Sequence, residues 1–162
     1  SSLTVALALS GWTFLSDDHV LAWREETGLR VAGLRVPLFL TADAAERLPP
    51  HLPKGREVPA MGKRMFRPEE LFPGQYRSET GVAATVFPER ATAVPSTLER
   101  LRSSDCFQRI VSSSPFLLTD PSARPCIDVA RAMADRPAFV LRAGPDLLEP
   151  RAADRVLRIA FA

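Results

Sequence analysis

The stretch that most constrains the fold is the N-terminal run SSLTVALALSGWTFLSDDHVLAW. Residues 2–10 are apolar on nearly every side, which predicts a helix that is buried against a sheet and its neighbours. Gly11 is a natural residue to end such a helix. The residues that follow, Trp12–Leu15, predict a short buried strand. This strand would place two adjacent carboxylates, Asp17 and Asp18, at its C-terminal edge.

Size and composition indicate an ordinary globular domain. The chain has 162 residues, of which 46% are hydrophobic and 25% are charged, and this predicts one domain with a sizeable core. The net charge of +2 is too small to indicate a nucleic-acid partner or a membrane surface. Only two of the 21 basic residues are lysines, Lys54 and Lys63, so these two stand out.

Cysteine usage and hydropathy indicate the cellular compartment of the protein. Cys106 and Cys126 have no metal-ligand spacing and form no disulfide framework, so we interpret them as small packed residues in a reduced, cytoplasmic protein. The apolar run Leu3–Leu9 is far shorter than the ~20 residues of a membrane span, and no basic segment precedes it. The chain starts without Met, inside an expected helix, so we interpret it as an N-terminally truncated fragment. Its oligomeric state stays open.

Strands and helices alternate along the rest of the chain. This order predicts a single α/β domain that has a mixed sheet with flanking helices. Ser96, with Glu99 three residues later, predicts a capping box at the start of a helix, and Thr41 predicts another N-cap. The expected strands are 19–23, 29–32, 36–40, 82–88 and 138–142. The expected helices are 42–48, 68–71, 97–111, one that begins at Ser122, and 147–160.

The Asp17-Asp18 pair has two interpretations. At the C-terminal edge of a strand in an α/β sheet, side chains face the crevice in which ligands bind. One carboxylate there can hold Mg²⁺, and an adjacent one can accept the proton of an attacking hydroxyl. The alternative is a hairpin, with two strands joined by a Ser-Asp-Asp turn, and the decapeptide FLSDDHVLAW alone favours that turn.

The helix expected before the Asp pair favours the ligand-binding interpretation over the hairpin turn. In a phosphate-binding loop of the form G-x-x-x-x-G-K-[ST], the Ser or Thr ends the loop, binds Mg²⁺ and opens a buried helix. Ser1, followed by Ser2, stands at the start of the expected helix. An ordinary helix N-cap is the alternative for both serines. The combination of the serines with the Asp pair favours a phosphate site.

Residues 1–23 resemble the stretch that follows the phosphate-binding lysine in the HPr kinase/phosphorylase family. They are most similar to its smaller bacterial relatives, which carry GKS[ST]LxxALxxxGxxxLSDD. Looser similarity extends to the segments GLRVAGLRVPLFL, GKRMFRPEELFP and ADRPAFVLRAG. The resemblance therefore covers most of the chain, and its specificity rests on residues 1–18.

This resemblance implies a P-loop kinase fold of the phosphoenolpyruvate-carboxykinase-like type, here without its first strands and its phosphate-binding loop. It implies ATP- and Mg²⁺-dependent phosphorylation of a hydroxyl. Ser1 and Ser2 would bind the nucleotide, with Ser1 also a Mg²⁺ ligand. Asp17 would be the general base, and Asp18 the metal-side carboxylate with a share in catalysis. Because the loop lysine is absent, the fragment itself is expected to be inactive.

Several further assignments stay open. No segment matches the basic loop that engages HPr, so a serine of a peptide or protein, or a small-molecule hydroxyl, is at least as good an acceptor. Lys63 and Arg64 could bind phosphate, or could be a solvated loop pair. His19 could position a substrate, or could be an ordinary strand residue. A non-catalytic nucleotide- or partner-binding module on the same fold is the alternative function, and an unrelated α/β domain is a third possibility.

Overall fold

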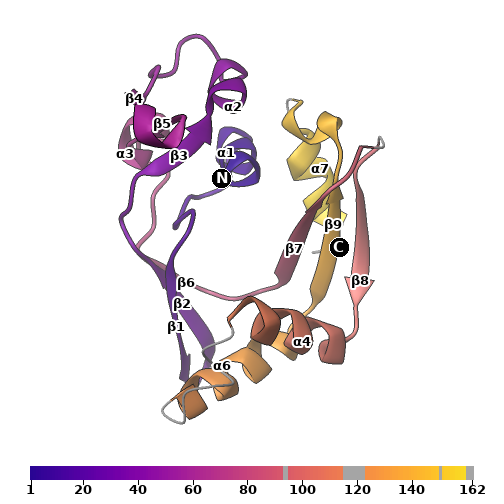
Figure 1. Cartoon of the computed structure of the whole chain (residues 1–162). Helices are drawn as coiled ribbons and strands as arrows, with labels where there is room; N and C mark the ends of the chain where they lie inside the picture. The colour runs from indigo at the N-terminus through magenta and orange to yellow at the C-terminus, as the bar shows by residue number, and fades with distance from the viewer. Residues whose placement is uncertain (93–94, 115–122, 150, 160–162) are drawn as a thin grey trace. The chain divides into compact units, whose positions relative to one another are not determined.

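The computed structural model describes residues 1–92, 95–114, 123–149 and 151–159 (Figure 1). The chain divides into two compact units. Unit 1 comprises Ser1–Leu21, Ala32–Glu79 and Leu147–Asp154, and unit 2 comprises the remaining segments. The expected mixed α/β fold with flanking helices is confirmed, although its strands form three small sheets. That one nucleotide-binding domain spans the whole chain stays a prediction.

Unit 1 is built on an antiparallel sheet of order β3-β5-β4. Its elements are α1 (Ser2–Leu9), β3 (Leu38–Thr41), α2 (Ala42–Glu46), β4 (Arg56–Val58), the 3₁₀ turn η1 (Pro59–Met61), β5 (Lys63–Phe66) and α3 (Pro68–Leu71). The Thr41 hydroxyl accepts a bond from the Ala44 N–H, so the predicted cap of α2 is confirmed. Helix α3 has the predicted bounds.

The core of unit 1 joins α1 to the sheet. The buried side chains come from α1, β3, β5 and the α3 region: Val5, Ala8, Phe14, Leu38, Leu40, Phe66, Leu71 and Phe72. Burial on every side of α1 was expected, and this is wrong. Only Val5 and Ala8 of the helix are fully buried, and Leu9 is 42% exposed.

The segment after α1 departs from the expected strand. Gly11 has φ +93°, a backbone conformation that favours glycine, and it ends the helix as predicted. The run Trp12–Leu15 forms only an isolated parallel bridge between Phe14 and Tyr76. Phe14 accepts from Arg77 N–H and donates to the Gln75 carbonyl, and its ring packs 5.6 Å from that of Phe72. A single anchored residue therefore replaces the predicted strand.

A second sheet has the order β1-β2-β6, with β1 at Val20–Glu25, β2 at Gly28–Gly33 and β6 at Glu79–Gly81. Strands were expected at 19–23 and 29–32, and both are confirmed with small shifts. Strand β1 pairs with β2 through a turn at Glu26-Thr27, whereas Phe14 bridges to Tyr76. The hairpin alternative for the Asp17-Asp18 pair is therefore wrong.

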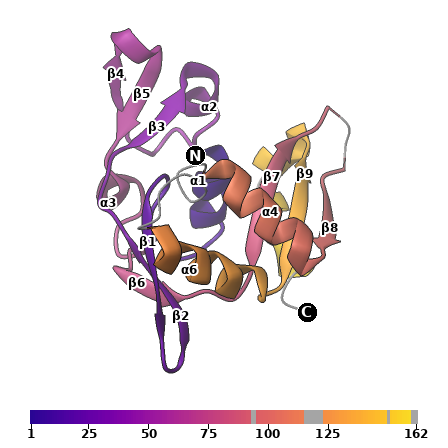
Figure 2. The same ribbon diagram turned by 60° about the horizontal axis from the view of Figure 1, so that its bottom comes forward.

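Unit 2 carries a mixed sheet of order β7-β9-β8. Strand β7 (Thr85–Arg90) is parallel to β9 (Ala138–Ala143), and β8 (Thr97–Leu101) is antiparallel to it. Helices α4 (Ser103–Ser113) and α6 (Arg124–Ala134) pack against each other beside this sheet (Figure 2). The helices bury Cys106 and Ala134 against Ala138, with Phe87, Leu101, Phe107 and Ile110 around them.

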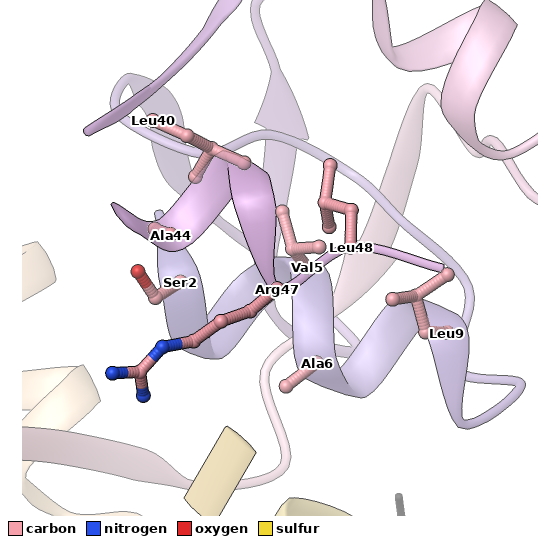
Figure 3. A pocket seen from close by; sticks show the side chains of 8 residues that line it. All are labelled: Ser2, Val5, Ala6, Leu9, Leu40, Ala44, Arg47 and Leu48. Carbon is pink, nitrogen blue, oxygen red and sulfur yellow. The ribbon is translucent and has the colours of Figure 1, made fainter. Parts of the chain in front are cut away.

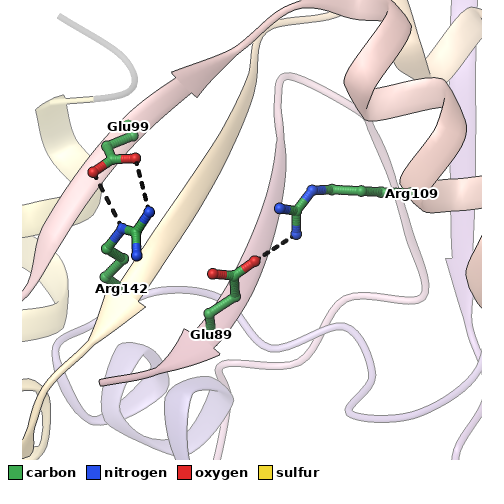
Figure 4. A network of polar contacts seen from close by, with 4 residues as sticks. All are labelled: Glu89, Glu99, Arg109 and Arg142. Carbon is green, nitrogen blue, oxygen red and sulfur yellow. Dashed lines mark hydrogen bonds and ion pairs between the residues drawn. The ribbon is translucent and has the colours of Figure 1, made fainter. Parts of the chain in front are cut away.

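The predicted helix 97–111 is wrong in its first third. Residues Thr97–Leu101 form strand β8, in which Leu98 pairs with Leu141 of β9. Glu99 does not complete a capping box, because its carboxylate meets the Arg142 guanidinium at 3.2 Å on the same sheet (Figure 4). The helix begins only at Ser103. Pairing with strand β9 therefore determines the conformation of Thr97–Leu101.

The C-terminal expectations hold in part. Strand β9 confirms the strand at 138–142. The helix expected over 147–160 consists of a 3₁₀ turn, η3 (Pro145–Leu148), and a shorter helix, α7 (Ala152–Arg158). Arg151, between them, has φ +62°, which a continuous helix does not allow. Ser122, the expected start of the preceding helix, lies outside the described residues.

Two other expectations concern the cysteines and the membrane. Both cysteines are free, as expected; Cys106 is fully buried, but Cys126 is exposed and so is not a packed residue. Among the described helices, none has the length and apolar character that crossing a bilayer requires.

Candidate functional site

The structure brings Ser1 and Asp17 together at the N-terminal end of α1. The Ser1 hydroxyl donates a hydrogen bond of 2.5 Å to Oδ2 of Asp17. The Asp17 side chain is only 7% exposed. Ser1 is the N-cap residue of α1, but its side chain makes no capping bond to the backbone. The hydroxyl is directed at a buried carboxylate instead of at the helix.

The second oxygen of Asp17 lacks a hydrogen-bond donor. Oδ1 is buried and forms an ion pair with the amino nitrogen of Ser1 at 3.3 Å, although no described residue donates a hydrogen bond to it. Buried carboxylates are normally paired, hydrogen-bonded or bound to a metal. The Asp17 oxygens and the Ser1 hydroxyl are hard donors of the kind that Mg²⁺ uses, and this ion takes one or two protein oxygens and keeps waters and phosphate oxygens as its other ligands.

A metal site built wholly from protein side chains does not fit. The described residues contain no cluster of three or more His, Cys, Asp or Glu side chains that could hold an ion. A structural zinc site uses about four protein ligands, a catalytic zinc site about three, and a calcium site about six to eight oxygen ligands. The donor set around Ser1 and Asp17 is thus suited to an ion that arrives with another ligand.

Asp18 and His19 have a different environment from Asp17. The Asp18 side chain is 75% exposed, and its Oδ2 lies 3.7 Å from Nε2 of His19, which is itself 67% exposed. Ser16 shapes this bend, because its hydroxyl lies 2.8 Å from the His19 carbonyl and 3.1 Å from the Leu34 carbonyl. The bend therefore holds one carboxylate inward and presents the next one to solvent.

Lys63 and Arg64 lie on strand β5. Lys63 is paired in register with Thr41 of β3 and Val58 of β4. Arg64 meets the Glu57 carboxylate and the Lys54 carbonyl, both at 3.4 Å. Among the described residues, no hydrogen bond or ion pair joins either side chain to Ser1 or Asp17. Arg64 is therefore already engaged within its own hairpin.

Ser2 lines a small pocket between α1 and α2 (Figure 3). The pocket has a volume of about 40 Å³ and is lined by Ser2, Val5, Ala6, Leu9, Leu40, Ala44, Arg47 and Leu48. That space accommodates a few water molecules. Ser2 and Arg47 are the polar residues of this lining.

Sequence reasoning missed two residues of this region. Arg47 follows α2 as its C-cap residue, which in sequence resembles an ordinary basic residue at a helix C-terminus. Trp12 donates from Nε1 to Oδ1 of Asp154 at 2.7 Å, which anchors the chain as it leaves α1. No local sequence signal predicts this second contact, because the partners are 142 residues apart.

No family model matches this chain, and neither does any curated protein or solved structure. Function is therefore inferred from the local geometry of Ser1, Asp17 and Asp18, together with the sequence pattern of residues 1–18.

Proposed function

We propose that this chain belongs to an ATP- and Mg²⁺-dependent phosphotransferase that resembles HPr kinases and phosphorylates a hydroxyl group. The fold would be of the phosphoenolpyruvate-carboxykinase-like P-loop type. The acceptor would be a serine of a protein or peptide, or a small-molecule hydroxyl. The observation that carries the proposal is the hydrogen bond from the Ser1 hydroxyl to the buried Asp17 carboxylate.

That contact supports the proposal because of where it lies. In P-loop enzymes, a Ser or Thr at the start of a helix and an Asp from another segment share the magnesium ion. Ser1 precedes α1, and Asp17 lies in the bend after the Phe14 bridge. Both groups are oxygen donors of the kind that Mg²⁺ prefers. When bound, Mg²⁺ neutralises charge on the phosphate oxygens.

The same contact favours an exchange of roles between the two aspartates. Ser1 touches Asp17, so Asp17 is the carboxylate placed to share a metal ion with Ser1. The resemblance alone implied the reverse order. Asp18 is exposed and adjacent, so it is the group placed to accept a proton from an acceptor that arrives from solvent. His19 contacts Asp18 and stays a candidate for positioning the acceptor.

In this proposal the chain's own residues perform two tasks. Ser1 and Asp17 hold the metal-bound end of the nucleotide. Asp18 accepts the hydroxyl proton as the acceptor oxygen bonds to the γ-phosphorus, while the bond from that phosphorus to the ADP oxygen breaks. Lys63 and Arg64 stay candidates for phosphate contacts from β5.

The decisive experiment begins with the coding sequence upstream of Ser1. We expect it to encode G-x-x-x-x-G-K directly before Ser1, since the backbone and lysine of that loop bind the phosphates. The protein carrying these residues should transfer phosphate from Mg·ATP to a serine-containing peptide or a small hydroxyl compound. An upstream sequence without the glycines and the lysine would refute the kinase proposal.

The alternative is a non-catalytic nucleotide- or partner-binding module on the same fold. Titration calorimetry separates the two proposals. If the protein binds Mg·ATP but forms no phosphorylated product with any hydroxyl acceptor, and ATP is not consumed, the binding module is correct. Asp18→Asn then has no activity to reduce, whereas in a kinase it lowers turnover by orders of magnitude.

A further inference from the structure

The sheet β3-β5-β4 of unit 1 has one face in the core and one open face. On the core face, Leu38, Leu40 and Phe66 pack with residues of α1. Because side chains alternate along a strand, the residues between these three point to the opposite side of the sheet. The pairing register gathers six side chains on this open face: Phe39, Thr41, Arg56, Val58, Lys63 and Met65.

The apolar side chains of the open face are not used by the core. Phe39, Val58 and Met65 are each partly exposed, and none belongs to the buried cluster of unit 1. Met61, in the turn η1 between β4 and β5, is 50% exposed. Apolar side chains that gather on an exposed surface mark sites of contact with other molecules, and Met adapts its shape to such partners. The open face therefore has the apolar part of a docking surface.

The charged side chains of the open face are all positive. Arg56 and Lys63 are diagonal neighbours, since Arg56 is in register with Met65 and Lys63 with Val58. Among the described residues, neither cation has an ion-pair partner. The acidic residue of these strands, Glu57, is in register with Arg64 and meets it at 3.4 Å on the core side of the pleat. The open face therefore presents two cations that its own strands do not neutralise.

We propose that the open face binds an acidic peptide segment of a partner protein, one that also carries apolar side chains. Its carboxylates pair with Arg56 and Lys63, and the Arg56 guanidinium can hold one carboxylate with two parallel bonds. Its apolar side chains contact Phe39, Val58 and Met65. This arrangement matches the charge of the surface and covers its exposed apolar groups. The inference goes beyond the proposed function and does not depend on phosphotransferase activity.

The spacing of the two cations indicates the form of the segment. Diagonal neighbours on one face of an antiparallel pair lie about 7–8 Å apart. Alternate residues of an extended peptide are about 7 Å apart and point to the same side. Two acidic residues at positions i and i+2 of an extended segment can therefore reach Arg56 and Lys63 together.

Two other kinds of ligand fit the open face less well. Surfaces that bind nucleic acids combine many cations with several aromatic rings, whereas this chain has a net charge of +2 and Phe39 is the aromatic residue among the six. A phosphate group held by both Lys63 and Arg64 does not fit either. Consecutive residues of β5 point to opposite faces, and Arg64 is engaged by Glu57.

The test is a titration of the 162-residue chain with the labelled peptide Glu-Ser-Glu-Ser-Leu-Ser-Leu, followed by fluorescence anisotropy and backbone amide NMR. Binding should shift the amides of Phe39, Val58 and Lys63 and should weaken with added salt. Two matched peptides replace both glutamates by glutamine, or both leucines by serine. Each should bind at least about tenfold more weakly, because one part of the recognition is lost. If the glutamine peptide binds as tightly as the glutamate peptide, the inference is overturned.

Variants of the chain locate the binding. Arg56→Gln and Lys63→Gln should each weaken peptide binding about threefold or more, and the double variant about tenfold or more. Met65→Gln, which keeps the length of the side chain, should weaken it as well. The matched control is Arg100→Gln, because Arg100 is an exposed strand arginine of β8 in unit 2. This variant should bind like wild type, and an effect equal to that of Arg56→Gln would mean that only net charge matters and would refute the inference.

Competition separates this inference from other roles of the same residues. An excess of Mg·ATP should not displace the peptide. If it does, and Lys63→Gln weakens the binding of Mg·ATP, Lys63 belongs to the nucleotide site and the docking inference fails while the phosphotransferase proposal stands. If a thymidine oligonucleotide binds through Arg56 and Lys63 and the acidic peptide does not bind, the open face is a nucleic-acid surface and the inference is overturned.

Discussion

The Ser96 hydroxyl donates a 2.7 Å hydrogen bond to Oδ1 of Asp146, and the Ser96 N–H donates to Oδ2 of the same carboxylate at 2.9 Å. The Ser96 oxygen in turn accepts from the Gly144 N–H at 2.9 Å. These bonds join the segment before β8 to the segment after β9. They replace the helix cap that the sequence predicts for Ser96, and they make Asp146 a pH-sensitive contact.

Stability should fall in acid through Asp146. The hydrogen bonds from the Ser96 N–H and hydroxyl lower the pKa of the Asp146 carboxyl. A carboxyl whose pKa is lower in the folded state stabilises that state above its unfolded pKa of about 3.9, and this contribution is lost as the pH falls through the folded value. Asp146→Asn should therefore lower Tm at pH 6, and its difference from wild type should shrink below about pH 4.

Thermal melts between about pH 2.5 and pH 7 measure this effect. Asp128→Asn is the control, since Asp128 is exposed and its nearest cation, Arg131, lies 3.9 Å away. A constant Tm difference between Asp146→Asn and wild type across this range would show that ionisation of Asp146 does not contribute.

Gly55→Ala should destabilise the protein by about 2–4 kcal/mol. Gly55 has φ +68°, and a Cβ added there would lie 2.6 Å from the buried Phe66 ring, so backbone strain and overpacking add together. Gly62→Ala is the matched control, because Gly62 has φ +59° but open space where the added methyl group would lie, and it should lose about 1–2 kcal/mol. Urea denaturation compares the two variants, and equal losses would remove the Phe66 contact as a cause.

The two cysteines should differ sharply in reactivity. Cys126 is exposed, whereas Cys106 is fully buried and burial raises the pKa of its thiol. Because the thiolate is the reactive form, a disulfide reagent at about pH 8 should modify Cys126 in the native protein and Cys106 only after denaturation. In Cys126→Ala the native protein should then show almost no reaction. Rapid modification of that variant would mean that the core around Cys106 opens readily.

The two ion pairs of unit 2 should contribute unequally (Figure 4). Glu89 and Arg109 are 2.6 Å apart and about 40% exposed, and the Arg109 guanidinium also lies over the Phe87 ring. Glu99 and Arg142 are 3.2 Å apart and more exposed. Double-mutant cycles should give a coupling of about 0.5–1 kcal/mol for the first pair and less for the second, both decreasing with added salt. The reverse order would contradict the geometry.

Substitutions of Asp17 and of Asp18 should have different effects on Mg²⁺ binding and on phosphoryl transfer. Asp17→Asn removes the carboxylate that we assign to the metal side, so Mg²⁺ affinity should fall at least tenfold in a calorimetric titration. Asp18→Asn should leave Mg²⁺ affinity unchanged and, in the protein that carries the upstream loop, should lower the rate of phosphoryl transfer. If Asp18→Asn weakens Mg²⁺ binding and Asp17→Asn does not, the roles implied by the resemblance are the correct ones.

Local signals determined much of the secondary structure. Pro68 at the first helical position predicts α3 with its observed bounds, and the Thr41 cap predicts the start of α2. The uniformly apolar run before Gly11 predicts α1 and its end. Each of these features depends on residues within a few positions of one another, so the sequence alone contains the necessary information.

Only the tertiary structure decided which residues meet. Thr97–Leu101 follows a helix cap signal at Ser96 but forms strand β8. The pairing with β9 satisfies the hydrogen-bonding groups of its backbone. The direction of Asp17 toward Ser1, the exposure of Asp18 and the position of Arg47 beside α1 likewise depend on packing between distant segments. The sequence by itself determined the residue types of the candidate site, and long-range packing determined its geometry.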